Sequence, residues 1–360
     1  MLRLPERTFG RPLAEISLVD MREEFKSGNK GLLSNELSKR MEEAFNSGEQ
    51  VMLFLNRRGY NSFISCRSCG EVIKCPNCDV SLSYHKSGIL QCHYCGYQIT
   101  HPNVCPSCSS PFIAGFGIGT EKVEEEIAKA FPDIKILRMD KDTTVRKNAQ
   151  AEILNTFREK KADCLIGTQM IVKGHDFENV TLVGAINADM GLFSNDYRSA
   201  ERTFDLLVQA SGRAGRGDKK GHVVIQTYQP EHYALIASGK QDYELFYNTE
   251  TAYRKLAGYP PYVNMFSMMI VSADERLAES FTSELVTVFR KVEQEKNRQT
   301  QIIGPAEADI KKINNEYRYM LYAKAPRGQS LTMLEDNAKL YLAKRYPDSD
   351  IRIVCEYETH

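Results

Sequence analysis

Four Cys-x-x-Cys pairs between residues 66 and 108 constrain the fold of this chain more than any other feature. Zinc takes four thiolates in a tetrahedron, and two residues between cysteines let one tight turn offer two sulfurs to the same ion. Disulfides are expected in a secreted and usually short chain, so this clustering favours metal. The predicted ligands of two zinc ions are Cys66, Cys69, Cys75, Cys78, Cys92, Cys95, Cys105 and Cys108.

The spacing between the pairs indicates which cysteines share an ion. The two inner pairs are separated by DVSLSYHKSGILQ, whose Ser-Gly makes a turn between two short strands, so they are predicted to form a zinc ribbon. The two outer pairs then hold the second ion, and sequential pairing along the chain is the alternative. The tyrosines of this stretch are suited either to stacking on nucleobases or to packing the small ribbon. The histidines surplus to the ligands are His85, His93 and His101.

The hydropathy of the chain argues against a membrane protein. Its net charge does not restrict the class of soluble partner. Forty-seven basic residues balance 47 acidic ones, so a surface for a polyanion must be local. The start, MLRLPERTFGRPL, has no apolar signal-peptide core, and no later stretch approaches the roughly 18–20 apolar residues of a membrane span. We therefore expect a cytoplasmic protein. Its 360 residues predict two or three domains.

Strand and helix patterns alternate on both sides of the cysteine-rich stretch. The apolar run VMLFLN suits a parallel strand covered on both faces, and a helix with apolar residues at four-residue spacing precedes it. This rhythm predicts an α/β domain with a parallel sheet, formed by residues 34–62 and 112–257, with residues 63–111 as a zinc-binding insertion. Residues 1–33 show no sustained period and are predicted to be a linker or approach segment. The expected strands are 51–56, 112–117, 134–139, 163–167, 180–185 and 222–228, and the expected helices after the insertion are 121–130, 145–160 and 200–210.

A different order of elements begins at GYPPYV, residues 258–263. The pattern predicts strand, helix, strand, strand, helix and strand, which most simply gives a ferredoxin-like two-layer α+β domain over residues 258–360. That fold has many functions, so it implies none by itself. The expected bounds are 264–272, 274–293, 302 onward, 318–325, 330–344 and 350–357.

Two segments of the α/β domain have the character of half a nucleotide site. GTQMIVKGHDF, residues 167–177, follows a buried strand and places Lys173, Gly174 and Asp176 in a loop. LVQASGRAGRG ends a helix and releases Arg213 and Arg216 into a turn, where two guanidinium groups can converge on phosphate. An ordinary basic turn that makes surface ion pairs is the alternative.

These segments together resemble the second RecA-like lobe of superfamily 2 helicases, through the pattern Q-x-x-G-R-x-G-R at residues 209–216. GFGIGTEKVEEEI, residues 115–127, also resembles the segment that opens the nucleic-acid-facing edge of this lobe. With the cysteine insertion after LFLNRRGY, and with SNDYRSAERTFDLL and AGYPPY, the whole chain is similar to the PriA (primosomal protein N′) family. The resemblance implies an ATP-dependent 3′–5′ DNA helicase that recognises stalled or abandoned replication forks and initiates primosome assembly for replication restart.

The resemblance also implies roles for individual residues. In the family pattern, the arginine turn reaches the γ-phosphate of ATP, and the loop after residue 172 approaches the ribose. The implied catalytic residues are Arg213, Arg216 and Gln209, and the implied nucleotide-binding residues are Gly174, Asp176 and Gly212. The implied nucleic-acid contacts in this domain are Thr168, Gln169, Lys173 and Thr120.

The phosphate-binding half of such a site does not occur in the 360 residues. The pattern G-x-x-x-x-G-K-[ST] (Walker A) is absent, and GFGIGTEK has the glycines but Thr-Glu where Lys-Ser is needed. No Asp-Glu-x-His sequence occurs either. The resemblance implies that these elements form a first lobe that precedes this sequence. ATP and Mg²⁺ are then expected only in the intact two-lobe protein, and the C-terminal part alone should not hydrolyse ATP.

The terminal domain offers a second expected surface for nucleic acid. NNEYRYMLYAKAPRGQSL places Arg318 and Arg327 among tyrosines, although alternation along the strand puts some tyrosines in the core. The partners that the resemblance implies are forked and single-stranded DNA, the single-stranded-DNA-binding protein, other primosome proteins and the loading machinery of the replicative helicase. It also implies association with the nucleoid. The alternative function is a non-enzymatic zinc-ribbon adaptor that docks DNA and replication proteins.

Overall fold

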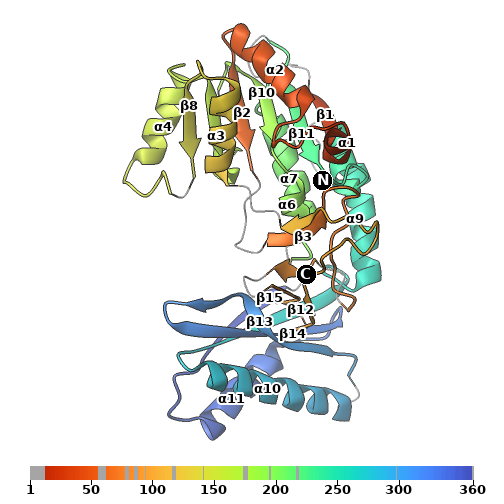
Figure 1. Cartoon of the computed structure of the whole chain (residues 1–360). Coiled ribbons are helices and arrows are strands. Elements are labelled where there is room, and N and C mark those ends of the chain that lie inside the picture. Colours follow the sequence, from red (N-terminus) through yellow and green to blue (C-terminus); the bar gives the residue numbers. More distant parts are fainter. Residues whose placement is uncertain are drawn as a thin grey trace.

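A six-stranded parallel sheet forms the core of the larger body in the computed structural model, at the top of Figure 1. The strand order is β1-β11-β10-β2-β9-β8, and every neighbouring pair is parallel. The strands are β1 (Glu15–Asp20), β2 (Gln50–Phe54), β8 (Ile136–Met139), β9 (Cys164–Gly167), β10 (Val180–Ala185) and β11 (His222–Thr227). The structure describes residues 13–55, 62–77, 81–84, 88–93, 95–115, 119–140, 142–172, 177–193, 196–215, 219–296 and 298–358.

Helices cover both faces of this sheet, as parallel strands require. Along β2, Val51 and Leu53 point into one core and Met52 and Phe54 into the other, because successive side chains alternate between faces. The first core is closed by α1 (Met21–Lys26), α2 (Asn35–Asn46) and α3 (Thr120–Ala130). The second is closed by α4 (Ala149–Arg158), α5 (Gln169–Val172), α6 (Asp189–Leu192), α7 (Ser199–Ser211), α8 (Tyr233–Lys240) and α9 (Tyr243–Ala257).

The prediction of a linker over residues 1–33 is wrong for the part that the structure describes. β1 pairs with β11 along its whole length, from Glu15 opposite His222 to Asp20 opposite Thr227. Asp20 then caps α1 by accepting from the backbone N–H of Arg22 at 2.9 Å. β1 is an edge strand whose side chains are mostly half-buried, so it lacks the continuous apolar run that marks the central strands.

The cysteine-rich insertion leaves the parallel sheet after β2 and forms a small antiparallel sheet of its own. Its strand order is β6-β5-β4-β3-β7. The prediction of a parallel strand at 112–117 is wrong. The described part, Ile113–Gly115, pairs antiparallel with β3 and so belongs to the insertion. The strands are β3 (Ser62–Cys66), β4 (Ser83–Tyr84), β5 (Ile89–Gln91), β6 (Gln98–Thr100) and β7 (Ile113–Gly115).

The C-terminal domain has the predicted βαββαβ order. Its antiparallel sheet runs β13-β14-β12-β15, the split arrangement of the ferredoxin-like fold. Two helices pack on one face of the sheet, at the bottom of Figure 1, and bury Phe266, Phe281 and Phe289. The elements are β12 (Val263–Ser272), α10 (Glu275–Glu295), β13 (Gln301–Ile313), β14 (Glu316–Pro326), α11 (Thr332–Arg345) and β15 (Arg352–Glu358).

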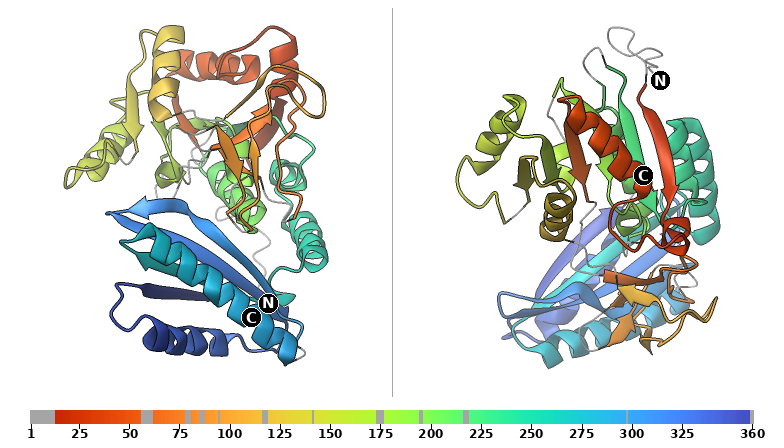
Figure 2. Two further views of the ribbon diagram at one scale, coloured as in Figure 1. Left: turned by 60° about the horizontal axis from the view of Figure 1, so that its bottom comes forward. Right: turned by 45° about the horizontal axis from the view of Figure 1, so that its top comes forward.

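The other face of this C-terminal sheet lies against the insertion. Met265 of β12 and Tyr322 of β14 share a core with Ile64, Leu90 and Cys92 of the insertion. The cysteine module therefore lies between the parallel-sheet domain and the C-terminal domain, as Figure 1 shows at β3. In the right view of Figure 2, the orange module overlaps the C-terminal domain that it contacts.

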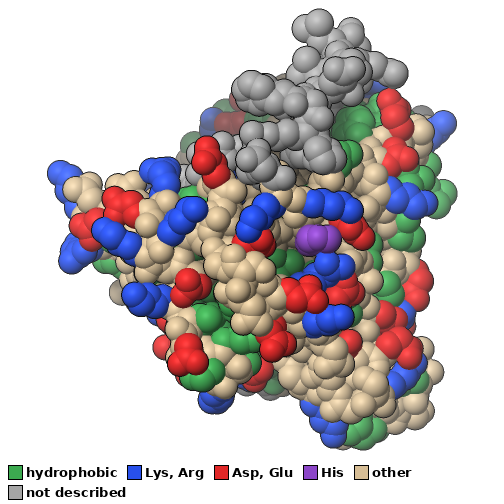
Figure 3. All heavy atoms as spheres, turned by 90° about the horizontal axis from the view of Figure 1, so that it is seen from above, with side chains coloured by type: hydrophobic (Ala, Val, Ile, Leu, Met, Phe, Trp, Pro, Cys, Tyr) green, Lys and Arg blue, Asp and Glu red, His purple; other side chains and the backbone are tan. Residues whose placement is uncertain are grey.

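The surface agrees with the balanced charge of the sequence. On the end of the molecule seen in Figure 3, basic and acidic side chains alternate around a histidine, and no single-sign field covers the coloured part. Among the described residues, Lys219 pairs with Glu49 at 2.5 Å and Lys220 with Glu15 at 2.8 Å. In the part of the chain that the structure describes, no helix is long and apolar enough to cross a membrane.

Candidate metal centre and nucleotide half-site

The outer cysteine pairs meet in space. The sulfurs of Cys66, Cys69, Cys105 and Cys108 all lie within 4.8 Å of one another. The Sγ atoms of Cys66 and Cys108 are 3.7 Å apart, and those of Cys69 and Cys105 are 3.6 Å apart. A zinc ion with Zn–S bonds of about 2.3 Å requires sulfurs about 3.8 Å apart, so the four thiols fit a tetrahedral ZnS₄ site.

The inner pairs form a second group. The sulfurs of Cys75, Cys92 and Cys95 lie together, with 3.6 Å between Cys75 and Cys95. Cys78, the fourth ligand predicted from the sequence, lies outside the described residues. The two groups are those of the nested pairing and not those of sequential pairing.

Each described cysteine turn has the backbone of a metal-binding knuckle. Gly70 N–H donates to Cys66 O, Gly96 N–H to Cys92 O and Ser109 N–H to Cys105 O, all at 2.9 Å. The donating residue follows the second cysteine of its pair and has a positive φ in each case, between 57° and 81°. This turn directs both sulfurs of a pair to the same point, which is the reason for the x-x spacing.

The outer thiols differ in acidity. Burial alone would raise the pKa of Cys66, but the backbone N–H groups of Cys69 and Ser68 donate to its sulfur and lower the pKa to about 7. Burial, together with contacts to neighbouring thiols, raises the pKa of Cys69 to about 12. Burial and the neighbouring thiols thus oppose ionisation of Cys69, and a cation held between the sulfurs would offset this cost. This donor set suits a thiophilic divalent cation.

The outer knuckle is seated directly on the parallel-sheet domain. Gln229 Nε2 donates to Gly70 O, and the Arg67 guanidinium lies 5.1 Å from the ring centroid of Tyr228. On the opposite side, the Nδ1 of His93 lies 2.9 Å from Glu307 O in β13. The module therefore contacts both neighbouring domains through its knuckles, and His93, which the sequence suggested was surplus, makes one of these contacts.

Gly70→Ala is expected to destabilise the protein more than Gly88→Ala. Both glycines have positive φ, 81° and 78°, so alanine costs each of them about 1 kcal/mol of backbone strain. A Cβ at Gly70 would also lie 2.4 Å from Tyr228 O, whereas nothing lies within 4 Å of a Cβ at Gly88. Thermal unfolding should show a total loss of roughly 3 kcal/mol for Gly70→Ala. Equal losses for the two variants would contradict this seating of the knuckle.

The structure brings the described parts of the two nucleotide-site segments together. Arg213 Nε donates to Val172 O, at the end of α5, at 2.8 Å. Gly215 N–H donates to Val180 O, at the start of β10, at 3.0 Å. The arginine turn is therefore bonded to the residues on both sides of the 173–176 loop. Four residues predicted for the site lie outside the described residues: Lys173, Gly174, Asp176 and Arg216.

Helix α7 positions the arginine turn. Phe204, Leu207 and Ala210 bury one side of the helix, and Gly212 follows its last residue. Gln209 is exposed on the opposite side, so its amide is available to a ligand or to another domain. The alternative of an ordinary surface turn does not explain why Arg213 is half-buried and bonded to a second segment.

A glycine makes the sharp turn that begins the other segment. A Cβ at Gly167 would lie 2.5 Å from Met139 O and 2.6 Å from a side-chain carbon of Ile171. Only glycine therefore lets α5 fold back so closely on the end of β9. Thr168 and Gln169 follow it, both half-buried at the carboxyl end of the sheet.

The predicted nucleic-acid contacts differ in their exposure. The structure does not agree with the predicted nucleic-acid contact of Thr120. The Thr120 side chain is only 3% exposed, and its hydroxyl donates to Asp140 Oδ2 at 2.6 Å, so it is not available at the surface. Arg318 is half-buried, and its guanidinium donates to Ile310 O at 2.8 Å across the β13–β14 hairpin. Arg327 is exposed just beyond β14.

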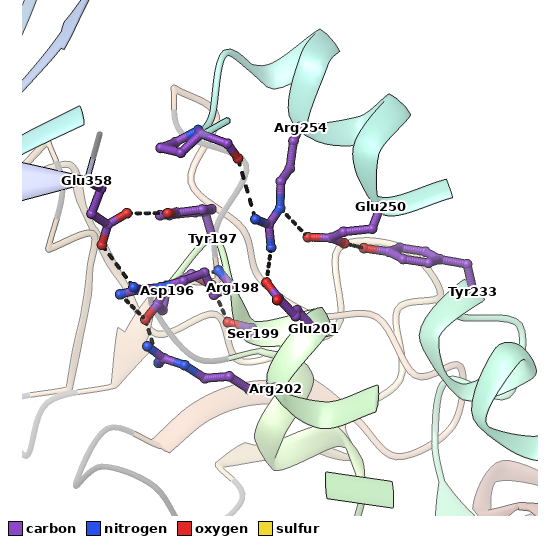
Figure 4. Close-up of polar contacts among 11 residues, drawn as sticks. Asp196, Tyr197, Arg198, Ser199, Glu201, Arg202, Tyr233, Glu250, Arg254 and Glu358 are labelled. Carbon is purple, nitrogen blue, oxygen red and sulfur yellow. Dashed lines mark hydrogen bonds and ion pairs between the residues drawn. The ribbon is translucent and has the colours of Figure 1, made fainter. Parts of the chain in front are cut away.

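Sequence reasoning missed the polar network before α7. Asp196, Tyr197 and Arg198 precede the helix and contact the C-terminal domain through Glu358 (Figure 4). In the sequence, the stretch SNDYRSAER stands out only through its family resemblance. Its density of charged residues beside a tyrosine was the available signal, but the partner lies 161 residues away in sequence.

Comparisons with known families cover most of the chain. The "Helicase conserved C-terminal domain" matches residues 113–218. The "PriA DNA helicase Cys-rich region (CRR) domain" matches residues 75–99, and the "Primosomal protein N C-terminal domain" matches residues 255–355.

Curated relatives match over nearly the whole chain. The chain is 48% identical over 335 residues to the replication restart protein PriA of Bacillus subtilis, covering 93% of this chain and 41% of that protein. It is 45% identical over 330 residues to the replication restart protein PriA of Synechocystis, covering 90% of this chain and 39% of that protein. The chain thus spans about two fifths of the length of these relatives.

Two solved structures resemble part of the chain. RecG bound to a three-way DNA junction is 15% identical, with a TM-score of 0.34, over 70% of this chain and 23% of that chain. The C-terminal domain of the DEAD-box protein Dbp5 is 12% identical, with a TM-score of 0.30, over 64% of this chain and 84% of that chain.

Proposed function

Because the chain belongs to the PriA family of replication restart proteins, we propose that it supplies the second RecA-like lobe, the cysteine module and the C-terminal domain of an ATP-dependent 3′–5′ DNA helicase. This helicase acts at stalled or abandoned replication forks and initiates primosome assembly. The observation that carries the proposal is the bonding of the Arg213 turn to both ends of the loop after α5.

In this proposal the chain supplies the half of the ATP site that responds to phosphate. A first lobe outside the 360 residues holds ATP and Mg²⁺, since no Walker A pattern occurs here. Arg216 reaches the γ-phosphate, and Arg213 supports it while holding Val172 O. Charge supplied in this way stabilises the transition state of phosphoryl transfer. The remaining residues proposed for this half-site are Gln209, Gly212, Gly174 and Asp176.

The cysteine module is proposed to hold two zinc ions that are structural. A structural site is closed by four protein ligands and leaves no position for substrate. The outer cluster provides four thiols and the inner cluster three described thiols, to which the proposal adds Cys78. The ions fix the knuckles that contact both neighbouring domains and take no part in hydrolysis.

DNA is proposed to run along the carboxyl end of the parallel sheet. Thr168 and Gln169 lie at this edge, and the proposal adds Lys173 from the loop that follows. In the C-terminal domain, Arg327 is the better candidate for a phosphate contact, because Arg318 already bonds Ile310 O. The proposed partners are forked and single-stranded DNA, the single-stranded-DNA-binding protein, other primosome proteins and the helicase-loading machinery, in the nucleoid.

Mixing this chain with a separately made first lobe tests the proposal. Each part alone is expected to hydrolyse no ATP, and the mixture is expected to show DNA-stimulated hydrolysis, measured as released phosphate. The control is the unseparated protein, in which both lobes belong to one chain. If it hydrolyses ATP while the mixture binds DNA without hydrolysis, the separate lobes do not reassemble, and the test is made on the unseparated protein. If that protein also lacks DNA-stimulated hydrolysis, the non-enzymatic adaptor is the correct function.

A further inference from the structure

Helix α7 joins two parts of the molecule that the proposed function treats separately. Its carboxyl end leads into Arg213 and the nucleotide half-site. Its amino end begins beside the C-terminal domain, at the residues drawn in Figure 4. A helix is stiff along its axis, because every turn is bonded to the next. Movement at one end of α7 is therefore transmitted to the other.

The turn before α7 is organised by one carboxylate. Asp196 accepts from the backbone N–H of Arg198 at 2.9 Å and pairs with Arg202 Nη1 at 2.5 Å. Burial would raise the pKa of Asp196, but these bonds and charges outweigh burial and lower it, so the group stays ionised. Ser199 Oγ also donates to Asp196 O. The turn and the first helical residues therefore move as one unit.

This unit is attached to the C-terminal domain through Glu358, at the end of β15. Glu358 accepts from the hydroxyl of Tyr197 and pairs with Arg198 Nη1 at 3.0 Å. Figure 4 shows both side chains converging on the two oxygens of this carboxylate. Glu358 lies opposite Met265 of β12, so it is fixed in the sheet of the C-terminal domain. One strand end therefore holds two consecutive residues that lead into α7.

The ring of Tyr197 is held between aromatic and cationic groups. It stacks on Tyr259 with centroids 4.8 Å apart and planes 7° apart. The guanidinium groups of Arg254 and Arg198 lie 5.1 Å and 5.3 Å from its centroid. Lys324 Nζ of β14 lies 3.6 Å from the centroid of the Tyr259 ring. The stack thus connects the α7 turn with a second strand of the C-terminal sheet.

Arg254 of α9 links α7 to α9 within the parallel-sheet domain. It donates from Nη2 to Glu201 of α7 at 2.5 Å and from Nε to Glu250 at 2.6 Å. Its Nη1 lies 3.4 Å from Pro260 O, in the segment that enters the C-terminal domain. Helix α7 is therefore tied to α9 independently of Glu358.

Two cavities flank Tyr197. One, of about 330 Å³, lies on the side of Phe193 and His232. The other, of about 230 Å³, lies on the side of Tyr322 and Glu358. Both are clefts open to solvent, so the side chains that line them have free space on one side. The attachment through Glu358 is thus polar and bordered by open clefts, unlike the apolar contact of the C-terminal sheet with the cysteine module.

We propose that Glu358 and Tyr197 are positioning residues for the nucleotide half-site: through α7 they couple the placement of the C-terminal domain to the placement of the arginine turn. This inference rests on the proposed function and adds a route by which DNA or a protein bound to the C-terminal domain changes ATP turnover. With Glu358 in contact, the amino end of α7 is held and the arginine turn is aligned. Without that contact, the turn is aligned less often.

The effect should appear in turnover and not in ATP affinity. ATP binds on the first lobe in the proposed function, and the arginine turn acts on charge that develops during phosphoryl transfer. Misalignment of the turn therefore lowers kcat and leaves KM for ATP unchanged. Changes of about threefold to tenfold are expected from mutations in such a coupling network.

The test compares Glu358→Gln, Tyr197→Phe and the double variant in the unseparated protein. DNA-stimulated kcat should fall about threefold to tenfold for each single variant, with KM for ATP unchanged. The double variant should lose little more than Glu358→Gln alone, because that change weakens both bonds of Glu358 and Tyr197→Phe removes one of the same two bonds. Glu356→Gln is the matched control, since Glu356 is exposed on the same strand two residues away and should retain full turnover.

Three results would overturn the inference. The first is DNA-stimulated turnover of Glu358→Gln equal to that of Glu356→Gln. The second is a loss that appears only in KM, and the third is a double variant whose losses multiply. Melting temperatures of the four proteins keep misfolding apart from misalignment, because Tyr197→Phe retains the stacked ring and should fold normally. Wild-type protein without DNA-stimulated turnover would instead overturn the proposed function itself.

Discussion

Cys66→Ser should release the outer zinc ion and destabilise the protein by more than about 4 kcal/mol, among the largest effects of any single substitution. Cys66 is fully buried, and its Sγ lies 3.7 Å from that of Cys108 in the proposed site. Serine cannot replace a thiolate ligand, and the binding free energy of a structural zinc ion is also folding free energy. The knuckle that this site closes contacts Tyr228 and Gln229, so the seating of the module should be lost as well.

The measurements are zinc content after denaturation with a chelating dye and the thermal unfolding curve. Cys355→Ser is the control, because Cys355 is half-buried in β15 and belongs to neither cluster. It should retain both the zinc content and most of the stability. Cys75→Ser should release the inner ion and leave the outer one, as expected of independent sites. Full zinc content in Cys66→Ser would contradict the outer site, and loss of all zinc in Cys75→Ser would contradict independence.

The parts of the fold that the sequence predicted are those with strong local patterns. β2, β9 and β10 are continuous apolar runs, because parallel strands between two helical layers are buried on both faces. The C-terminal domain was predicted in full because its strands alternate and α10 is long and amphipathic. In both cases, burial follows a regular pattern along each strand or helix, so the sequence of that element alone reveals it.

Two strands that the sequence did not predict, β1 and the antiparallel β7, depend on distant partners. β1 is half-buried at a sheet edge, and only its pairing with β11, more than 200 residues later, makes it a strand. β7 has three residues, and the cysteine geometry of the insertion decides that it pairs with β3. α9 was missed although its signals are local. Asp242 caps it by accepting from Leu245 N–H, and Gly258 ends it with φ of 61°.

The same distinction applies to the site. The cysteines are arranged by spacing and turn geometry, so their grouping could be inferred from the sequence. The Arg213–Val172 bond joins residues 41 apart, and only the family resemblance suggested that the two segments meet. Thr120 was predicted to contact nucleic acid because its motif resembles a nucleic-acid-facing edge. Asp140, 20 residues later, accepts its hydroxyl hydrogen in the buried interior instead.

Arg216→Ala should abolish most DNA-stimulated ATP hydrolysis in the unseparated protein, lowering kcat by about 10³-fold or more, the effect expected of an arginine that meets the γ-phosphate. KM for ATP should change little, because the first lobe binds the nucleotide in the proposed function. Arg213→Ala should behave differently. Its Nε bonds Val172 O, so its loss should loosen the loop after α5 and weaken DNA stimulation along with turnover.

Arg213→Lys and Arg158→Ala complete the comparison. Lysine keeps the positive charge of Arg213 but lacks the planar fork, so Arg213→Lys should resemble Arg213→Ala if the bond to Val172 O matters more than the charge. Arg158 is exposed at the end of α4 and donates to Asn155 Oδ1 within the same helix, so Arg158→Ala should retain full turnover. The assignment of Arg216 would be wrong if Arg216→Ala kept near-normal turnover. If Arg213→Lys were fully active, the role of Arg213 would be its charge, and the bond to Val172 O would be incidental to catalysis.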